Sequence, residues 1–241
     1  MTLPVTDPWL QPPVLEGRHV RLEPLARAHQ SALAEVVQDG ALWRPFYSNV
    51  PVARAHQSAL AEVVQDGALW RPFYSNVPEP AAAGAYVETA LAEQAAGRAL
   101  PFAVRDAHGV IIGSTRYYDL ARAVPRLSIG YTWYAARVQR TGLNTEAKLL
   151  LLEYAFGTLG CIAVELRTSW FNHASRAAIA RLGAKQDGVL RAHMRHRDGS
   201  VRDSVVFSIL DHEWPAVRSN LRTRLARYDA TVAAPAGSGA P

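Results

Sequence analysis

Two spacings of hydrophobic residues recur along the chain, and they predict strands interspersed with helices. Segment His19–Pro24 alternates apolar and charged residues, as in a half-buried strand. Segment Glu213–Tyr228 instead repeats apolar residues at helical spacing. The same criteria predict further strands at Pro101–Arg105, Val110–Tyr118, Leu127–Tyr134, Ala163–Thr168, Val189–Arg197 and Ser200–Leu210. They predict further helices at Ala28–Gln38, Pro80–Ala96 and Thr145–Leu159, and a short helix that ends at Leu182.

The pattern indicates a single domain with short, dissimilar ends. Residues 1–14 form a proline-containing arm, residues 15–228 the domain, and residues 229–241 a tail. The tail is rich in alanine, proline and glycine from Thr231 onward, which favours disorder. The pair Asp198-Gly199 is a favoured hairpin turn and joins the last two strands.

An exact repeat interrupts this pattern, because segments Ala26–Pro51 and Ala53–Pro78 are identical. Repeats that build solenoids diverge and usually occur three or more times, so one perfect pair indicates a recent or engineered duplication. Each unit reads as a helix followed by an aromatic loop. One copy is surplus to the domain, and the two compete for a single place in it. We expect the second copy to dock, because it keeps the direct link into helix Pro80–Ala96, and the first to pack outside.

The segment Gln139–Glu146 carries the strongest chemical signal. It lies between a predicted strand and an apolar helix, and it contains Gly142. A turn that opens a helix presents free backbone N–H groups and the positive end of the helix dipole, which suits a pyrophosphate. The alternative is a purely structural turn, in which Thr145 caps the helix and Glu146 is a first-turn acid.

Composition narrows the possible functions. The formal charge is +5, and Lys148 and Lys185 are the only lysines among the basic residues. These residues are spread out without a basic aromatic stripe, so nucleic-acid binding is not expected. No apolar run is long enough for a membrane span, and the N-terminus does not resemble a secretory signal. Cys161 is the only cysteine, which agrees with a cytoplasmic protein, and no Cys/His spacing indicates a metal.

Two motifs together resemble the GNAT superfamily of acetyl-CoA-dependent N-acetyltransferases, in particular the ribosomal-protein alanine N-acetyltransferase branch. That family carries Gln/Arg-x-x-Gly-x-Gly/Ala at the start of its central helix and Asn-x-x-Ser before a short helix that ends in Leu-Gly. The resemblance extends from about Leu15 to Leu225. The matching residues in this chain are Gln139, Gly142, Asn172, Ser175 and Leu182-Gly183. Asn144 departs from the first motif, because the family usually has a small residue at this position.

The resemblance implies an α+β GNAT fold, with a central mixed, mostly antiparallel sheet flanked by helices and one extra helix-loop unit. It also implies acetyl-CoA as co-substrate, bound through the turn between strand and helix. Asn172 matches the family residue that hydrogen-bonds the cofactor arm, although it also suits a helix cap. The implied cofactor-binding residues are Arg137, Gln139, Arg140, Thr141, Gly142, Leu143, Asn144, Thr145 and Asn172.

The catalytic residues are less well defined by the resemblance. Ile179 stands where many family members have a tyrosine that protonates the leaving thiolate, so that role does not transfer. Ser175 is the nearest remaining hydroxyl and becomes a candidate for a proton relay to the thiolate. The alternative is a purely structural role in the first helical turn. Tyr134 and its neighbour Trp133 lie on the strand that, by the resemblance, offers backbone groups to the cofactor. The alternative is that their side chains only pack in the core.

No single general base stands out. Glu165, His173 and Asp203 are candidates, since a carboxylate or imidazole can deprotonate an alkylammonium through water. His193 and His196 lie near the last hairpin and read as a solvated edge.

Two functions remain open from the sequence. One is transfer of an acetyl group to a primary amine, either a peptide N-terminus or a small amine of unknown identity, directly within a ternary complex. The other is a non-catalytic GNAT-fold module that binds CoA or a partner protein, an alternative that Ile179 keeps open. A homodimer is compatible with either.

Overall fold

The computed structural model describes residues 7–39, 77–78, 80–196 and 198–233, and these residues form one eight-stranded sheet in the order β1-β2-β3-β4-β5-β6-β8-β7. The strands are β1 (Leu15–Glu16), β2 (Val20–Pro24), β3 (Ala99–Asp106), β4 (Ile111–Ala121), β5 (Arg126–Tyr134), β6 (Ala163–Ser169), β7 (Lys185–Arg195) and β8 (Val201–Leu210). The α-helices are α1 (Gln30–Val36), α3 (Ala83–Ala95), α4 (Leu143–Gly157), α5 (His173–Leu182) and α6 (Trp214–Ala233). Short 3-10 turns are η1 (Arg27–His29), η5 (Pro80–Ala82) and η6 (Ala136–Val138).

Every pair of neighbouring strands is antiparallel except β5 and β6, which run parallel. The expected mixed, mostly antiparallel sheet is therefore confirmed. The parallel ladder has only three registered pairs, from Arg126↔Ala163 to Ser128↔Glu165. Both strands continue beyond this ladder without pairing to each other, so a gap opens in the sheet between their carboxyl ends.

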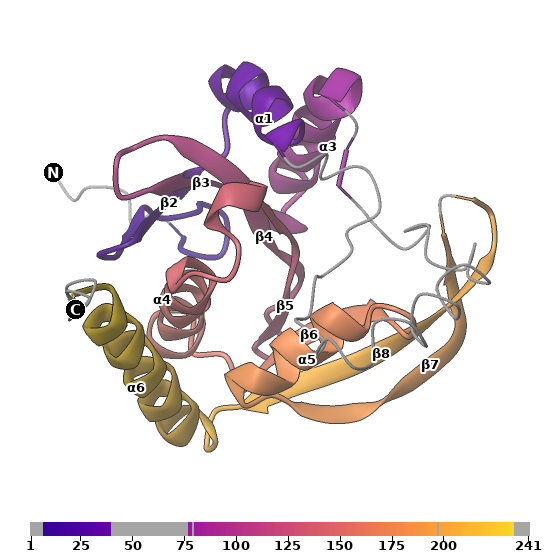
Figure 1. Cartoon of the computed structure of the whole chain (residues 1–241). Coiled ribbons are helices and arrows are strands. Elements are labelled where there is room, and N and C mark those ends of the chain that lie inside the picture. Colours follow the sequence, from indigo (N-terminus) through magenta and orange to yellow (C-terminus); the bar gives the residue numbers. More distant parts are fainter. Residues whose placement is uncertain (1–6, 40–76, 79, 197, 234–241) are drawn as a thin grey trace, which may run out of the picture.

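Helices cover both faces of the sheet (Figure 1). α1 and α3 pack on one face, where Tyr86 of α3 donates to the Ser114 hydroxyl of β4 at 3.2 Å. α4 packs on the other face, where the buried Tyr117 of β4 donates its hydroxyl to the carbonyl of Leu151 at 2.6 Å. α6 lies against α4 and also contacts α5, which covers β6 and β8.

The first copy of the repeat supplies α1, contrary to the expectation that the second copy would dock. Leu33, Val36 and Val37 are buried in the main core, and α1 contacts α3 and β4. The first copy follows β2 directly through Leu25, so it reaches this place by the shorter connection. Because the copies are identical, the same side chains are available for these contacts in either case. Residues 40–76, which hold almost all of the second copy, lie outside the described residues.

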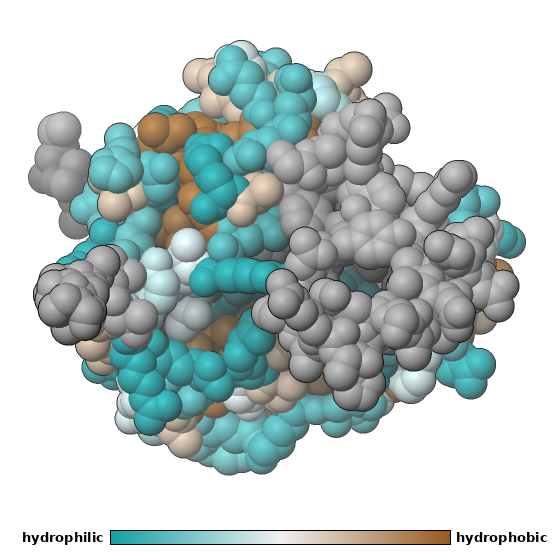
Figure 2. Space-filling model, in the orientation of Figure 1, coloured by the Kyte–Doolittle hydropathy of each residue, from teal (hydrophilic) through white to brown (hydrophobic). Residues whose placement is uncertain are grey.

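The C-terminal part follows the expected hairpin and helix with two differences. The hairpin between β7 and β8 is confirmed, but β7 ends at Arg195 and β8 begins at Val201, so the connection is longer than the predicted two-residue turn. Gly199 lies in this connection with φ +83°, a left-handed conformation that glycine adopts without strain. α6 continues to Ala233, past the expected start of the tail at residue 229. Its outward surface is mainly hydrophilic (Figure 2), and its exposed arginines are Arg218, Arg222, Arg224 and Arg227. Within the described residues, no helix has the length and hydrophobicity of a membrane span.

Candidate active site

A bulge in β5 lies in the part of the strand that is not paired to β6. Ser114 of β4 pairs with Trp133, whereas Arg116 pairs with Gly130, so Thr115 faces both Tyr131 and Thr132. Tyr131 has φ +51°, a strained value for a residue with a side chain. Bulges of this kind redirect side chains and release backbone groups from the ladder, and they are frequent beside active sites. The bulge and the gap between β5 and β6 therefore mark the same region.

Two consecutive residues after the bulge bury polar donors that have no partner in the described part of the chain. These donors are the Nε1 atom of Trp133 and the hydroxyl of Tyr134. Burial raises the pKa of Tyr134 well above that of a free phenol, so the hydroxyl stays protonated. Buried polar groups are paired in the great majority of cases, and orphaned ones concentrate at functional sites. The end of β5 is thus a candidate for binding a ligand with acceptor atoms.

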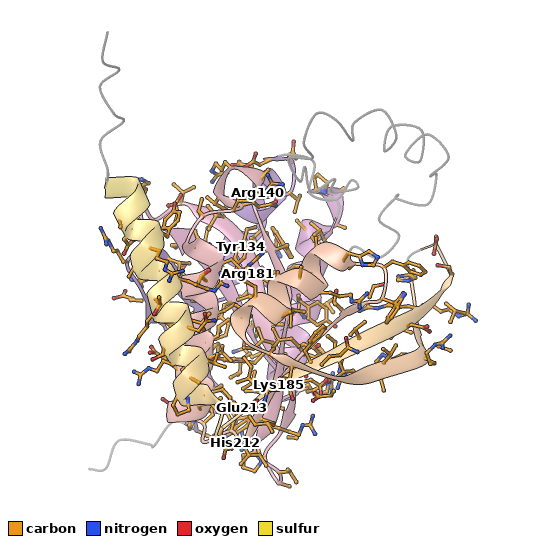
Figure 3. The ribbon with its side chains drawn as sticks, turned by 60° about the horizontal axis from the view of Figure 1, so that its bottom comes forward. Tyr134, Arg140, Arg181, Lys185, His212 and Glu213 are labelled. Atoms are coloured by element: carbon orange, nitrogen blue, oxygen red, sulfur yellow. The ribbon has the colours of Figure 1, made fainter. Side chains whose placement is uncertain are left out.

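The turn that follows β5 leads directly into α4 (Figure 3). The side chain of Gln139 donates to the carbonyl of Tyr134 at 3.1 Å, and Arg140 has φ +62°. The Thr141 hydroxyl donates to the Val138 carbonyl at 2.7 Å and accepts the N–H of Leu143, the first residue of α4, at 3.3 Å. These contacts fix the turn at the helix N-terminus, where a phosphate would meet the positive end of the helix dipole.

Gly142 has a packing role that the sequence did not reveal. A Cβ atom at this position would lie 2.6 Å from the ring of Tyr228 on α6. The absence of a side chain therefore allows α6 to lie against the turn. Packing against Tyr228 thus gives a structural reason for a glycine in this turn, and binding of the cofactor by the turn remains a prediction.

Arg137 is engaged elsewhere than the predicted phosphate site. Its guanidinium forms an ion pair with Asp39, just after α1, at 2.9 Å. Of the two arginines predicted to bind phosphate, Arg140 lies in the turn before α4 itself (Figure 3). Asn144 and Thr145 lie in the first turn of α4, because this helix begins at Leu143, two residues before the predicted start. The alternative in which Thr145 caps the helix is therefore wrong, and the N-cap is Gly142.

Glu146 and Lys148, both buried on α4, were not identified as important from the sequence. The Glu146 carboxylate accepts backbone N–H bonds from three consecutive residues, Arg18, His19 and Val20, at 2.6 to 3.0 Å. This carboxylate therefore ties the β1–β2 turn to the helix. The Lys148 Nζ donates to the Thr132 hydroxyl of the bulge at 2.7 Å, and burial lowers the pKa of Lys148 to about 7.

Asn172 and Ser175 meet at the start of α5. The Asn172 side chain accepts the N–H of Ser175 at 3.0 Å, which is the N-terminal cap considered from the sequence. Gly183 ends the helix in the left-handed conformation, with φ +106°, as the Leu-Gly motif predicted. Ile179 is buried in the core. Roles for Asn172 in cofactor binding and for Ser175 as a relay remain predictions.

The candidate general bases are mostly occupied by other contacts. Glu165 lies buried between Arg126 and Arg167, and each guanidinium donates to one of its carboxylate oxygens. Asp203 accepts from Arg191 and from the N–H of Ala192, and the latter bond is the main cause of its lowered pKa. His173 is exposed.

The two hairpin histidines differ in environment. His193 is exposed and bonds the Ser204 hydroxyl at 3.1 Å. His196 is buried, so its expected position on a solvated edge is wrong. Burial, followed by the nearby Arg202, lowers the pKa of His196.

A pocket of about 310 Å³ opens on the face of the sheet that carries α3. Its wall includes Tyr131 of the bulge, so the pocket borders the unpaired part of β5. The other lining residues include Tyr86, Glu93, Arg98, Arg116, Tyr118 and Asp119. This pocket could not be predicted from the sequence, because its residues come from α3, the start of β3, β4 and β5.

Residues 50–185, more than half of the chain, match the family model of the acetyltransferase (GNAT) domain. The chain belongs to this family. Membership confirms the enzyme class expected from the sequence, the acetyl-CoA-dependent N-acetyltransferases.

Among curated proteins, the chain is 30% identical over 106 residues to the Bacillus subtilis (strain 168) protein named "Putative ribosomal N-acetyltransferase YdaF". This match covers 44% of the chain and 57% of YdaF, less than two thirds of that relative.

Solved structures agree over most of the chain. A GCN5-related N-acetyltransferase from Brucella melitensis is 28% identical with a TM-score of 0.68, covering 88% of this chain and 85% of that one. The fold is also that of Mycobacterium smegmatis RimJ in complex with CoA-disulfide, at 20% identity and a TM-score of 0.65, covering 88% of this chain and 95% of RimJ.

Proposed function

We propose that the protein transfers an acetyl group from acetyl-CoA to a primary amine, either a peptide N-terminus or a small amine, by direct attack within a ternary complex. Acetyl-CoA supplies an acyl group activated as a thioester. The amine nitrogen forms the new C–N bond, the C–S bond breaks, the amine loses a proton and the thiolate gains one. The observation that carries this proposal is the unpaired end of β5, where the buried hydroxyl of Tyr134, which has no partner among the described residues, adjoins the turn that opens α4.

The turn Gln139–Thr145 would hold the pyrophosphate through backbone N–H groups, with Arg140 adding positive charge. Two related structures support the cofactor. M. smegmatis RimJ is in complex with CoA-disulfide, and the microcin C7 self-immunity acetyltransferase MccE is in complex with acetyl-CoA and AMP. The name of YdaF, a putative ribosomal N-acetyltransferase, supports an amine of a ribosomal component as one class of acceptor.

Tyr134 is the residue that we assign to hydrogen-bond donation during transfer. Its hydroxyl is buried, has no partner in the described residues and stays protonated because burial raises its pKa. A neutral phenol can donate to an oxyanion or to a leaving thiolate, and such donors contribute most in a site that excludes water. Ser175, at the start of α5, remains the second candidate for passing a proton to the thiolate.

The proposal is tested by incubating the protein with acetyl-CoA and a panel of N-terminal peptides, polyamines and aminoglycosides, and following both acetylated products by mass spectrometry and release of the CoA thiol. Tyr134→Phe keeps the ring and removes the hydroxyl. We expect it to lower kcat about 10- to 1000-fold with little change in CoA affinity. Tyr154→Phe, which loses only a hydroxyl contact to the Pro8 carbonyl, serves as the control. CoA binding without transfer to any amine would favour the non-catalytic alternative.

A further inference from the structure

Arg116 is a buried cation with no hydrogen bond or ion pair to any described residue. Its side chain comes from β4, beside the bulge, and the residue is only 4% exposed. Its Nε atom is fully buried without a partner, and the residue lines the pocket of about 310 Å³. A buried guanidinium nitrogen without a hydrogen-bond partner costs free energy, and an acceptor that enters the pocket would offset this cost.

Two tyrosine rings hold this guanidinium in place. Its Cζ atom lies 4.0 Å from the ring centre of Tyr131 and 4.9 Å from that of Tyr86. Both rings are pocket walls, and Tyr86 is itself fixed by its hydrogen bond to Ser114. Cation–π contacts of this kind orient a guanidinium while leaving its N–H groups free for an acceptor. The arginine is therefore preorganised.

The remaining charges on the pocket wall are already paired. The guanidinium of Arg98 donates one hydrogen bond to each carboxylate oxygen of Glu93, at 2.7 and 2.9 Å. Asp119 pairs with Arg167 at 3.0 Å. Among the described lining residues, Arg116 is thus the one charged side chain without an ion pair, and it is positive. The bond from Arg98 is the main cause of the lowered pKa of Glu93, and the charge of Arg116 adds to this effect from a longer distance. A ligand with one negative charge fits this balance better than a dianion, which the two carboxylates would repel.

A second buried guanidinium reinforces the preference for an anion. Arg202 of β8 is 8% exposed, and its Nε atom is also buried without a partner in the described residues. Burial lowers the pKa of Arg202, while the neighbouring Tyr118 and Tyr131 partly offset this effect. Because Tyr118 and Tyr131 both line the pocket, Arg202 lies close behind its wall.

We propose that Arg116 binds a carboxylate of the acceptor, so that the acceptor class is a small amine carrying a carboxylate, of the size of an amino acid. The inference rests on the proposed function, because it takes the pocket beside the β5 bulge as the acceptor side. The pocket volume lies at the lower end of the range for small-molecule sites, which suits a ligand of this size. The planar fork of arginine matches the two oxygens of a carboxylate and gives it a defined orientation.

The test uses binding rather than turnover, because the acetylated product must leave through the same pocket. N-acetylglycine, N-acetylalanine, N-acetylmethionine and N-acetylphenylalanine are each paired with the corresponding amide, and binding to the full chain with CoA is measured by ligand-observed NMR. We expect at least one carboxylate to bind about tenfold tighter than its amide. Equal binding within every pair, or no binding of any carboxylate, would overturn the proposal.

Variants locate the effect. Arg116→Gln should abolish the preference for the carboxylate, and Arg116→Lys should restore part of it, because the charge returns without the planar fork. Arg122→Gln makes the same change at an exposed residue paired with Asp7 and should leave the preference intact. If Arg116→Gln does not fold, the proposal is still tested by Arg116→Lys and by the carboxylate and amide ligands measured with the wild-type protein. If the protein prefers carboxylates but transfers no acetyl group, the proposed function is wrong and the present inference stands. If it transfers acetyl groups but does not prefer carboxylates, only the present inference is wrong.

Discussion

Lys148 donates its ammonium group to the hydroxyl of Thr132 at 2.7 Å, and this contact places a buried cation against the bulge of β5. The Thr132 hydroxyl also lies 2.8 Å from that of Thr115 on β4. A lysine on the core-facing side of α4 therefore supports the strand segment that carries the candidate site. Because burial disfavours its charged form, Lys148 has a pKa of about 7, far below the value of a solvated lysine.

The first prediction concerns pH and stability. Between pH 7 and about 10.4, the unfolded chain carries a proton on Lys148 that the folded chain has lost, so raising the pH stabilises the fold by up to roughly 1.4 kcal/mol per unit. Relative to Lys148→Met, the free energy of unfolding of the wild type should rise by about 2 kcal/mol between pH 7 and pH 9. Urea unfolding of both proteins measures this difference, and a constant difference across that range would refute it.

The second prediction concerns Glu146. Glu146→Gln removes the charge that three backbone N–H groups share, and it should destabilise the protein by about 1–3 kcal/mol. Glu153→Gln is the control on the same helix, because it breaks only the exposed pairs with Arg218 and Arg222 and should cost less than about 1 kcal/mol. Urea unfolding compares the two. Equal effects would mean that the Glu146 contacts contribute no more than surface ion pairs.

The third prediction concerns the repeat. Deleting either copy with one linker residue gives the same sequence, so only substitutions can tell the copies apart. Leu33→Asp places a charge in the core, and it should be tolerated if the second copy can replace the first. Leu60→Asp alone should also be tolerated. The double variant should lose about 3 kcal/mol or more, or fail to fold.

Circular dichroism and urea unfolding of the three variants decide this point. If Leu33→Asp alone is as damaging as the double variant, the second copy cannot take the place of α1.

The fourth prediction concerns the reaction path. Cys161 is buried, and burial raises the pKa of its thiol to about 12, so it is a poor nucleophile. Cys161→Ala should retain transfer to the amine within a few-fold, as direct attack requires. Isolation of a peptide with acetyl-Cys161 from protein incubated with acetyl-CoA would instead establish a covalent route.

Local patterns were sufficient for much of the fold. These patterns depend only on nearby residues. The alternation in Val20–Pro24 predicted a strand, Gly183 a helix end and Gly199 a hairpin, and the structure confirms all three. The turn before α4 also lies where the sequence placed it. Its glycine was correctly noticed, but its contact with Tyr228 is long-range and left no local signal.

Other parts depend on contacts between distant segments. Glu146 binds a turn more than 120 positions away, and Arg116 acquires its significance from Tyr86 and Tyr131, which lie on different elements. Neither could be identified from spacing. The choice between the two repeat copies could not be predicted either, because identical side chains give identical packing energies and only chain connectivity separates them.

The short ladder between β5 and β6 leaves the two halves of the sheet weakly connected through backbone bonds. α6 packs against α4 on one side and α5 on the other, with Trp214 stacked on Phe156 and Leu221 fully buried, so it braces the halves from outside. The packing of α6 against α4 and α5 therefore helps to set the width of the opening at β5. Substitutions along the buried side of α6 could retune cofactor access over evolutionary time while every residue at the site stays unchanged.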